Sequence, residues 1–356
     1  MVLLSIVVLL SLWVITSNIY YVHREHINQI KRNQLMTLIK ELTGKHNETF
    51  DTKQFASLTR QLSANTRLTG GVLAQLIQGE QGLSRAKLFD ALAPYGLPDI
   101  ASNELKNLQS IYTSKRLWAA ANLQYLAADT TIASALKSAL KDRESTIRLA
   151  SAQALSALAQ ADATCVIIRS LCARRAIPWG RIVELMPGLG QAAITPLITS
   201  LTDNTLTDDE RAVTLAALGV LKATPAEALI DEHISHSSKH VRIQACKALG
   251  NLCATKSITT LMQAMTDDAW EVRVVCAHAL GQIAGSVSVA ALSAHLSDPV
   301  YWVRYNCADA LSRISPDGLS ELQKQSNSED PFVRDVCRLI LDRQAHLAPL
   351  MDMEAV

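Results

Sequence analysis

The sequence predicts an all-α solenoid of stacked helix pairs behind one N-terminal transmembrane helix. Two observations lead to this prediction: nine arginines recur at steps of 30 to 33 residues, and an uncharged apolar run opens the chain. A fixed period of this size indicates one helical unit stacked on copies of itself, because a single copy cannot bury its apolar face alone. The arginines are Arg85, Arg116, Arg148, Arg181, Arg211, Arg242, Arg273, Arg304 and Arg334.

The apolar run at residues 2–22 carries no charge. As a helix it would span roughly 30 Å, the thickness of a bilayer core. No basic residue precedes the run and no small-residue cleavage site follows it, so an uncleaved anchor is favoured over a signal peptide. Arg24, Lys31 and Arg32 follow it. Because basic flanks stay inside, we expect the N-terminus outside and the body in the cytoplasm.

The segment 23–51 is predicted to form a juxtamembrane helix and a linker. Residues 23–43 are compatible with a helix and carry a loose apolar stripe, which we expect to pack on the repeats rather than on a partner helix. Gly44 is a plausible helix stop, and a polar stretch follows it. The anchor and this helix together would form a stalk.

Each predicted unit consists of a shorter apolar helix, a turn and a longer helix. Residues 258–265 precede 267–283 in this way, and 289–296 precede 298–314. Counted from the arginine, positions −1, +3, +7 and +10 are apolar or small, so they form one stripe along the longer helix. We expect the solenoid to cover residues 52–344, most clearly 145–341, and a C-terminal tail to cover 345–356.

Three features predict how the longer helix begins and packs. Aspartates stand where an N-cap would accept the free amides of the first turn. Prolines follow within that turn, where a missing N–H costs nothing. Glycines at position +8 let neighbouring helices come close. These residues are Asp267, Asp298 and Asp330, then Pro299 and Pro331, then Gly219, Gly250 and Gly281.

The repeated arginine is expected to hold the units together rather than to bind a ligand. One arginine at a fixed place in every repeat suits a ladder of hydrogen bonds to carbonyl groups or to the capping aspartate of a neighbouring unit. The predicted structural ladder consists of Arg148, Arg211, Arg242, Arg273, Arg304 and Arg334.

These units resemble the HEAT-like repeat family, in the short form D-P-x-x-x-V-R-x-x-A-x-x-A-L-G-x-I that also occurs in phycocyanobilin lyases. The resemblance is strong over 145–341, weaker around Arg116 and Arg181, and marginal at Arg85. It implies a curved right-handed α-solenoid that binds other proteins in its concave groove. The repeat type and the anchor together suggest a bacterial inner-membrane protein.

The sequence predicts no enzyme, no cofactor and no metal site. No histidine is followed by glutamate, the pair with which HEAT-like deoxyhypusine hydroxylases bind iron. A net charge of +1 argues against a nonspecific nucleic-acid binder. The seven cysteines are an odd number, and four of them fall three or four residues after an arginine. We expect buried thiols at these four, Cys246, Cys276, Cys307 and Cys337, rather than disulfides or metal ligands.

A row of polar side chains is the candidate binding surface. Positions +2, +5 and +9 lie opposite the apolar stripe of the longer helix, and the resemblance would place them in the concave groove. An ordinary solvent-facing surface would explain their polarity equally well. The candidate groove residues are Gln244, Lys247, Asn251, His278, Gln282, Asn306, Asp309 and Arg313.

Aromatic residues gather just before the arginines, at the turn into the longer helix. They are Trp270, Tyr301, Trp302 and Phe332. A large residue there can pack against the next unit, or it can form an exposed hot spot for a partner. We expect the packing role.

The predicted function is a tethered scaffold or adaptor that mediates protein–protein interaction at the cytoplasmic face of the membrane, for a partner in a membrane-associated complex. Two alternatives remain. One is a lyase-like or small-ligand-binding protein that uses the groove, and the other is a nucleic-acid binder. The sequence favours the adaptor, because concave repeat surfaces usually contact proteins.

Overall fold

The computed structural model describes residues 26, 29–30, 33, 97–126, 129–173, 177–203 and 205–353 of the chain. The predicted anchor over 2–22, nearly all of the predicted juxtamembrane segment, and the solenoid up to residue 96 lie outside the described residues. The chain divides into two compact units, Met1–Leu158 and Ala159–Val356. In the described part of both units every regular element is a helix, which confirms the predicted all-α solenoid.

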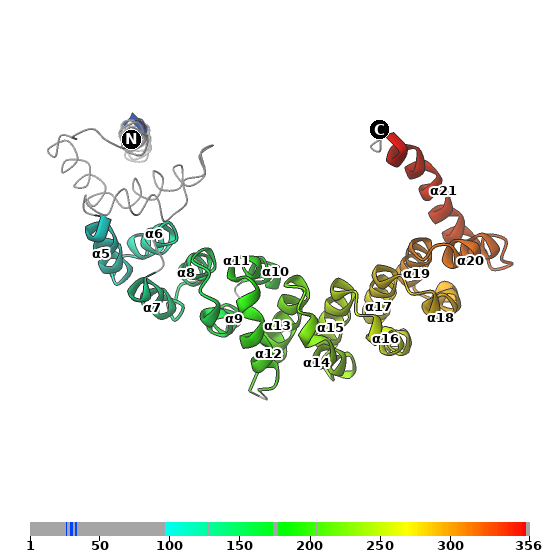
Figure 1. Ribbon diagram of the computed structural model, residues 1–356, viewed down its shortest axis with the longest axis horizontal. Coiled ribbons are helices and arrows are strands. Elements are labelled where there is room, and N and C mark those ends of the chain that lie inside the picture. The colour runs from blue at the N-terminus through cyan, green and yellow to red at the C-terminus, as the bar shows by residue number, and fades with distance from the viewer. Residues whose placement is uncertain are drawn as a thin grey trace, which may run out of the picture. The chain divides into compact units, whose positions relative to one another are not determined.

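The first unit contains four described helices, α5 (Leu97–Leu108), α6 (Thr113–Leu123), α7 (Thr130–Ala139) and α8 (Ser145–Ala157). Helix α6 packs on α5 and on α8, and α7 packs on α8 (Figure 1). Their core is aliphatic and fully buried: it includes Leu123, Leu136, Ile147 and Leu155. Arg116 and Arg148 lie at the same place, one turn into α6 and α8, as the period predicts.

The second unit begins with its least regular repeats. Short helices η2 (Ala161–Ala163) and α9 (Thr164–Cys172) come first, and the repeat around Arg181 splits its longer helix into α10 (Trp179–Val183) and α11 (Met186–Leu189). Gly190 ends α11 with φ 71°, a left-handed backbone that favours glycine. Then follow η4 (Gln191–Ala193), α12 (Ile194–Leu201), α13 (Asp208–Val220), η5 (Thr224–Ala226), α14 (Glu227–Asp231) and η6 (Glu232–Ser235).

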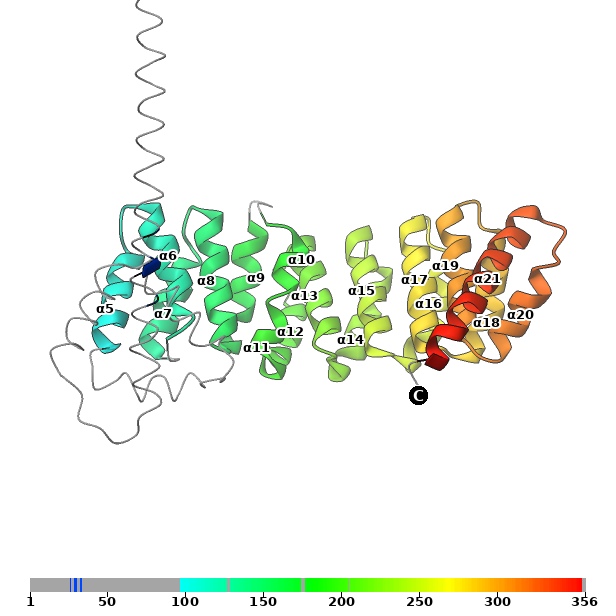
Figure 2. The same ribbon diagram turned by 90° about the horizontal axis from the view of Figure 1, so that it is seen from above.

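The regular repeats of the second unit follow one another in sequence and in space. They comprise α15 (Lys239–Leu252), η7 (Thr255–Ser257), α16 (Ile258–Ala264), α17 (Trp270–Ile283), η8 (Ser286–Ser288), α18 (Val289–Ala294), η9 (His295–Ser297), α19 (Tyr301–Arg313), α20 (Asp317–Gln325) and α21 (Pro331–Met353). The longer helices α13, α15, α17 and α19 pack side by side in one row, here called the B row (Figures 1 and 2). The shorter helices form a second row.

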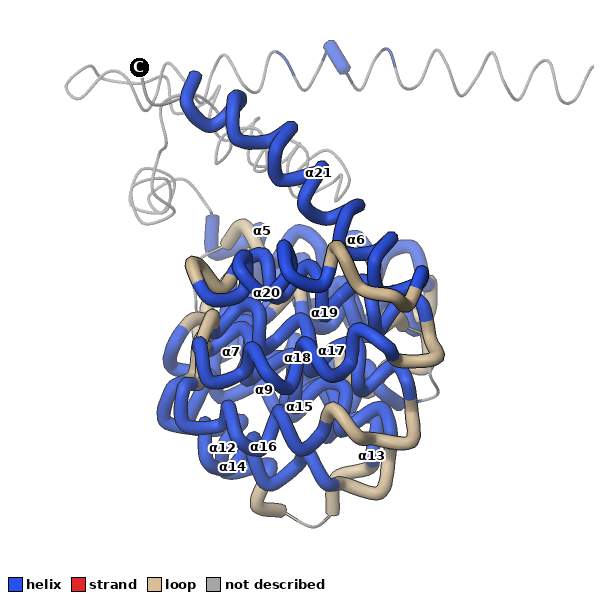
Figure 3. The backbone as a smooth tube through the Cα atoms, turned by 90° about the vertical axis from the view of Figure 1, so that its right-hand side faces the viewer, coloured by secondary structure: helices blue, strands red, loops and turns tan. Residues whose placement is uncertain are grey.

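Helix α21 belongs to the last repeat but is longer than the other helices. It packs on α19 and α20 and then continues to Met353, so it extends through most of the predicted tail over 345–356. Figure 3 shows α21 rising away from the stacked helices. In the part of the chain that the structure describes, no single helix is long and apolar enough to cross a membrane, although one bent pair, 179–189 with 191–201, meets the length and composition requirements.

The predicted apolar stripe forms the core between the rows. In α17, Val272, Cys276 and Leu280 are fully buried, whereas Ile283 at the end of the stripe is half-buried. The predicted buried thiols Cys246, Cys276, Cys307 and Cys337 are all in the core. Burial of these small and aliphatic side chains is the main favourable term of the stack, at about 25 cal/mol per Å² of apolar surface.

Glycines bring neighbouring helices of the B row into backbone contact, as their +8 position predicts. A Cβ atom placed on Gly250 would lie 2.9 Å from the Cα atom of Ala279, and one on Gly281 would lie 2.8 Å from the Cα atom of Ala310. Gly219 stands against Ala248 in the same way. The alanines occupy position +6 of the following helix, so the close approach needs a small residue on both sides.

Gly250→Ala should therefore destabilise the protein by about 1–3 kcal/mol, because the new methyl group has to push α15 and α17 apart. The measurement is the urea midpoint of the full-length protein in detergent. Gly180→Ala is the matched control, since nothing lies within 4 Å of its added Cβ and alanine favours a helix. Equal midpoints for the two variants would contradict the close approach.

Candidate functional site

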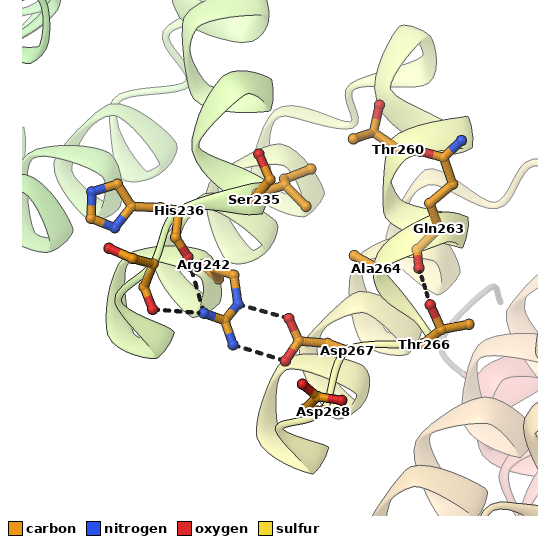
Figure 4. A pocket seen from close by; sticks show the side chains of 11 residues that line it. Ser235, His236, Arg242, Thr260, Gln263, Ala264, Thr266, Asp267 and Asp268 are labelled. Carbon is orange, nitrogen blue, oxygen red and sulfur yellow. Dashed lines mark hydrogen bonds and ion pairs between the residues drawn. The ribbon is translucent and has the colours of Figure 1, made fainter.

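The repeated arginines bind both their own turn and the next repeat. Arg242 donates from Nε and Nη2 to the two carboxylate oxygens of Asp267, at 2.7 and 2.9 Å, and from Nη1 to the carbonyls of His236 and Ser237, both at 3.0 Å (Figure 4). Arg273 repeats the arrangement, with Asp298 at 2.8 and 3.1 Å. The planar guanidinium suits this double role because its donors point along two edges.

The first unit contains the same contact. Arg116 donates to both carboxylate oxygens of Asp142, at 2.8 and 3.3 Å, and to the carbonyls of Ser110 and Ile111. Arg148 donates from Nη1 to the carbonyls of Asp142 and Arg143, at 3.0 and 3.2 Å. The contacts therefore have the predicted form, while their contribution to stability remains a prediction.

The aspartates that pair with arginine are not the N-caps that the sequence predicts. Asp267 and Asp298 accept the N–H of Ala269 and Val300, each at 2.8 Å, and these two residues are the N-caps of α17 and α19. Pro299 thus precedes the first helical turn. Sequence alone cannot separate the two positions, because an aspartate satisfies a free amide in either place. For Asp330 the prediction is correct, since its carboxylate accepts the N–H of Phe332 and Pro331 begins α21.

The surroundings of the paired aspartates favour their ionised carboxylates. Burial acts to raise the pKa of Asp267 and of Asp298, but hydrogen bonds from the guanidinium and the turn amide outweigh it, so both pKa values lie below the ordinary range. The open depression beside Asp267 has a volume of about 510 Å³ and a largely polar lining (Figure 4). Arg242 and Asp267, which are bound to each other, form part of its wall.

Two arginines of the second unit depart from the Arg–Asp pair by lacking any carboxylate partner among the described residues. Two others, Arg181 and Arg334, pair within their own repeat, with Glu184 and Asp335. Arg211 donates from Nη1 to the Leu201 carbonyl at 3.3 Å and lies 3.1 Å from Nε2 of His233. The Nδ1 atom of His233 lies 2.7 Å from the Leu229 carbonyl. Since a carbonyl only accepts, Nδ1 carries the proton, and Nε2 accepts from Arg211. The ring is therefore held neutral. The second departure is at Arg304, which has carbonyl partners but no carboxylate partner among the described residues.

The structure brings the candidate groove residues together on the B row, on α15, α17 and α19. Lys247 and Arg313 are exposed, whereas Gln244, Asn251, His278, Gln282 and Asn306 are half-buried. Burial and the charges of Arg313 and Lys247 lower the pKa of His278, while Asp309 acts to raise it. Residues from three consecutive repeats thus share one electrostatic neighbourhood. Their part in binding remains a prediction.

Asp309 is already engaged within the chain. It is 6 % exposed and pairs with Arg313 at 2.8 Å and with Arg343 of α21. Arg343 also donates to the Tyr305 hydroxyl at 2.8 Å. Sequence reasoning missed Arg343, although it stands at position +9 of the last repeat, the same register as Arg313. Helix α21 therefore covers the Asp309 end of the candidate groove.

The predicted packing role of the aromatic residues is wrong for most of them. Trp270, Tyr301, Trp302 and Phe332 are 40 %, 45 %, 55 % and 64 % exposed. Positions −3 and −2 lie in the first turn of the longer helix, outside its buried stripe, so these side chains are only partly covered. Tyr301 and Trp302 meet edge to face at 5.4 Å, and the Phe332 ring reaches the preceding repeat, 5.1 Å from the Arg304 guanidinium. We call these four residues the aromatic edge.

No reactive or metal-binding cluster appears among the residues that the structure describes. Groups of three or more His, Cys, Asp or Glu side chains that could hold a metal ion are absent from them. Burial, and then Glu210 and Asp209, raise the pKa of Cys172 to about 12. The Sγ atoms of Cys246 and Cys276 lie 3.2 Å apart in the core, and both thiols are free. Cys253, which is not one of the four cysteines expected in the core, is exposed.

Comparison with known proteins agrees with the repeats. The family model of HEAT repeats matches residues 194–271 and 226–312. The solved structure of human deoxyhypusine hydroxylase in complex with glycerol is similar, with 19 % sequence identity and a TM-score of 0.30. The match covers 72 % of this chain and 99 % of that chain. The complex of CpcE and CpcF of phycocyanin lyase from Nostoc sp. PCC7120 has 21 % identity, 68 % and 94 % coverage, and a TM-score of 0.32. Kap95p, in a structure with RanGDP, has 13 % identity, 89 % and 52 % coverage, and a TM-score of 0.44. A search of the curated proteins found no match to this sequence.

Arg273→Ala should lower the free energy of unfolding by about 2–4 kcal/mol, because it removes charge-assisted bonds and leaves Asp298 without its cation. The measurement is urea unfolding of the full-length protein. Arg304→Ala is the matched control, since it removes carbonyl bonds and ring contacts but no carboxylate pair, and we expect a smaller loss. Equal losses would show that the carboxylate pair contributes nothing beyond the turn.

Stability should depend on pH through His233. Burial and then the charge of Arg211 keep its pKa below the ordinary value of about 6.5, although the Leu229 carbonyl and Glu232 oppose this. Above about pH 6.5 the His233 ring is neutral in both the folded and the unfolded chain, so its contribution to stability is complete. As the pH falls from about 6.5 towards the folded-state pKa, the unfolded chain binds the proton first and stability is lost.

The test compares the urea midpoints of the wild-type protein and His233→Gln at pH 7.5 and 5.5. Glutamine does not titrate and can still accept from Arg211. We expect the wild type to lose more stability on acidification, by on the order of 1 kcal/mol. Identical pH dependence of the two proteins would contradict the neutral, buried ring.

Proposed function

We propose that this chain is a membrane-tethered scaffold or adaptor that binds a protein of a membrane-associated complex at the cytoplasmic face of a bacterial inner membrane. The observation that carries the proposal is the aromatic edge, four large side chains left exposed along consecutive repeats. Exposed aromatic clusters mark protein contact sites more often than they mark free surface.

The polar B-row surface supports a protein partner rather than a small ligand. Lys247, His278 and Gln282 come from neighbouring helices and present hydrogen-bonding groups on one side of the stack. A small ligand needs a concave pocket that encloses most of its surface. The depression of about 510 Å³ in Figure 4 is instead open, and the paired side chains of Arg242 and Asp267 form part of its lining. A broad partner surface suits these features better.

Tethering through residues 2–22 would make weak contacts sufficient. A partner in the same membrane meets the solenoid at a raised effective concentration, so a modest affinity can give stable occupancy. The basic residues Arg24, Lys31 and Arg32 support an orientation with the solenoid in the cytoplasm. Since anchor and binding surface lie in separate parts of the chain, each can be removed alone.

The first experiment is crosslinking in intact membranes, followed by detergent extraction, pull-down of the full-length protein and mass spectrometry. A chain that starts at Asp51 is the control for tethering. We expect the full-length protein to remain in salt-washed membranes and to crosslink to one recurrent membrane protein, and the shortened chain to do neither. A full-length protein that washes off would overturn the tether. A bound small molecule without a protein partner would favour the lyase-like alternative, and salt-sensitive retention of DNA would favour nucleic-acid binding.

Lys247→Ala combined with His278→Ala should reduce capture of that partner at least about tenfold, because two of the groups on the B row would be lost. The unfolding midpoint should change little, since Lys247 is exposed and His278 half-buried. Lys324→Ala, an exposed lysine of α20 outside the B row, is the matched control. If the double variant captured the partner as well as the wild type does, the prediction that the B row forms part of the binding surface would be wrong.

A further inference from the structure

The Arg304 rung of the arginine ladder lacks its carboxylate. Arg304 donates from Nη1 to the carbonyls of Asp298 and Pro299, at 2.7 and 3.1 Å, as Arg273 does to its own turn. Its Nε atom is buried and has no hydrogen-bond partner. Among the described residues no acidic side chain forms an ion pair with it. A buried guanidinium donor without an acceptor costs free energy, about 1–3 kcal/mol for an ordinary polar group and more for a charged one.

The cause of the vacancy is one residue in the last turn. In the complete rungs of the second unit the residue six places before the next arginine is Asp267 or Asp298, which binds the turn amide with one oxygen and the preceding arginine with both. In the last repeat that position is Ser328. Its hydroxyl still accepts the turn amide of Asp330, at 3.3 Å, so the turn is kept. A hydroxyl has no second oxygen with which to reach Arg304.

The neighbouring Asp330 does not fill the gap. Its carboxylate accepts the N–H of Phe332 at 2.9 Å and caps α21. The serine therefore removes the carboxylate from the ladder while the turn and the cap both remain intact. The vacancy is a local feature of an otherwise well-formed repeat.

Two rings of the aromatic edge lie against the Arg304 guanidinium, whose Nε atom is buried. The Phe332 and Tyr301 ring centres lie 5.1 and 5.8 Å from the Arg304 Cζ atom. In both Arg273 and Arg304, Nη1 donates to two carbonyls of the arginine's own turn. The Nε and Nη2 edge of Arg304 therefore corresponds to the edge with which Arg273 binds Asp298. Phe332 is 64 % exposed, so its ring can turn aside without disturbing the core. Trp302, 55 % exposed, lies one residue beyond Tyr301.

We infer that Arg304 binds a single carboxylate side chain of the protein partner, carried by a segment whose apolar residues lie on the aromatic edge. This inference rests on the proposed function and adds the chemistry of the partner. The Arg273–Asp298 pair is a model for this contact, because Arg273 binds that carboxylate through the same Nε and Nη2 edge at 2.8 and 3.1 Å. Glu329, Asp330 and Asp335 lie in the same repeat, so one carboxylate is favoured over a phosphate or a run of acidic residues.

The chain offers a substitution that closes the site from within. Ser328→Asp restores the residue of the complete rungs, so its carboxylate should occupy the Arg304 edge and exclude the partner. Ser328→Asn has nearly the same size without the charge and serves as the matched control. Arg304→Gln removes the guanidinium. Circular dichroism and the thermal midpoint check that each variant folds, and the Ser328→Asp midpoint should be at or above that of the wild type.

The experiment selects random displayed peptides on the full-length protein in detergent and measures the selected peptides by fluorescence anisotropy. We expect them to share one Asp or Glu beside apolar residues. Replacing that acid by its amide, or using Ser328→Asp or Arg304→Gln protein, should weaken binding at least about tenfold, whereas Ser328→Asn should not.

Three outcomes would overturn the inference: no selected peptide, peptides without an essential acid, or equal binding to Ser328→Asp. The crosslinking experiment separates this failure from failure of the proposed function. A membrane partner whose capture is unchanged in Ser328→Asp would leave the adaptor intact and remove Arg304 from its contact. Absence of any protein partner would remove the adaptor itself.

Discussion

Each complete rung of the arginine ladder consists of one guanidinium shared between two turns. Arg242 binds two carbonyls of its own turn and the carboxylate at the start of the next, and Arg273 does the same one repeat later. The carbonyls would otherwise be left without donors where the chain enters the longer helix. The pair thus fixes the turn and sets the position of the following helix. Apolar burial then acts on helices that are already in register.

The apolar side of the stack imposes a complementary constraint. Gly250 and Gly281 stand directly on Ala279 and Ala310, which places neighbouring backbones in contact. This explains why the core uses small and aliphatic residues, and why the few aromatic side chains of the regular repeats lie outside it. Large rings do not fit between such close helices. Exposure of the aromatic edge therefore follows from the packing, and binding is its proposed use.

The period and the local pattern were sufficient to predict the fold, the close glycine contacts and the carbonyl bonds of the arginines. They were insufficient where one position allows two geometries. Asp267 could cap a helix or stabilise the turn before it, and only the structure distinguishes these roles. The pattern describes one helix at a time, so it could not predict that Arg343 of α21 pairs with Asp309 of α19. The missing carboxylate at Arg304 can be recognised only by comparing its contacts with those of Arg242 and Arg273 in the structure.

Helix α21 also determines whether the stack can continue. On the inner helices, positions +4 and +8 hold residues that the next helix covers, such as Ala277 and Gly281. On α21 the same positions hold Arg338 and Asp342, both exposed. A charged pair there cannot accept the backbone of another repeat or of a second molecule. The outer face of α21 therefore disfavours the close backbone contact through which the inner repeats stack.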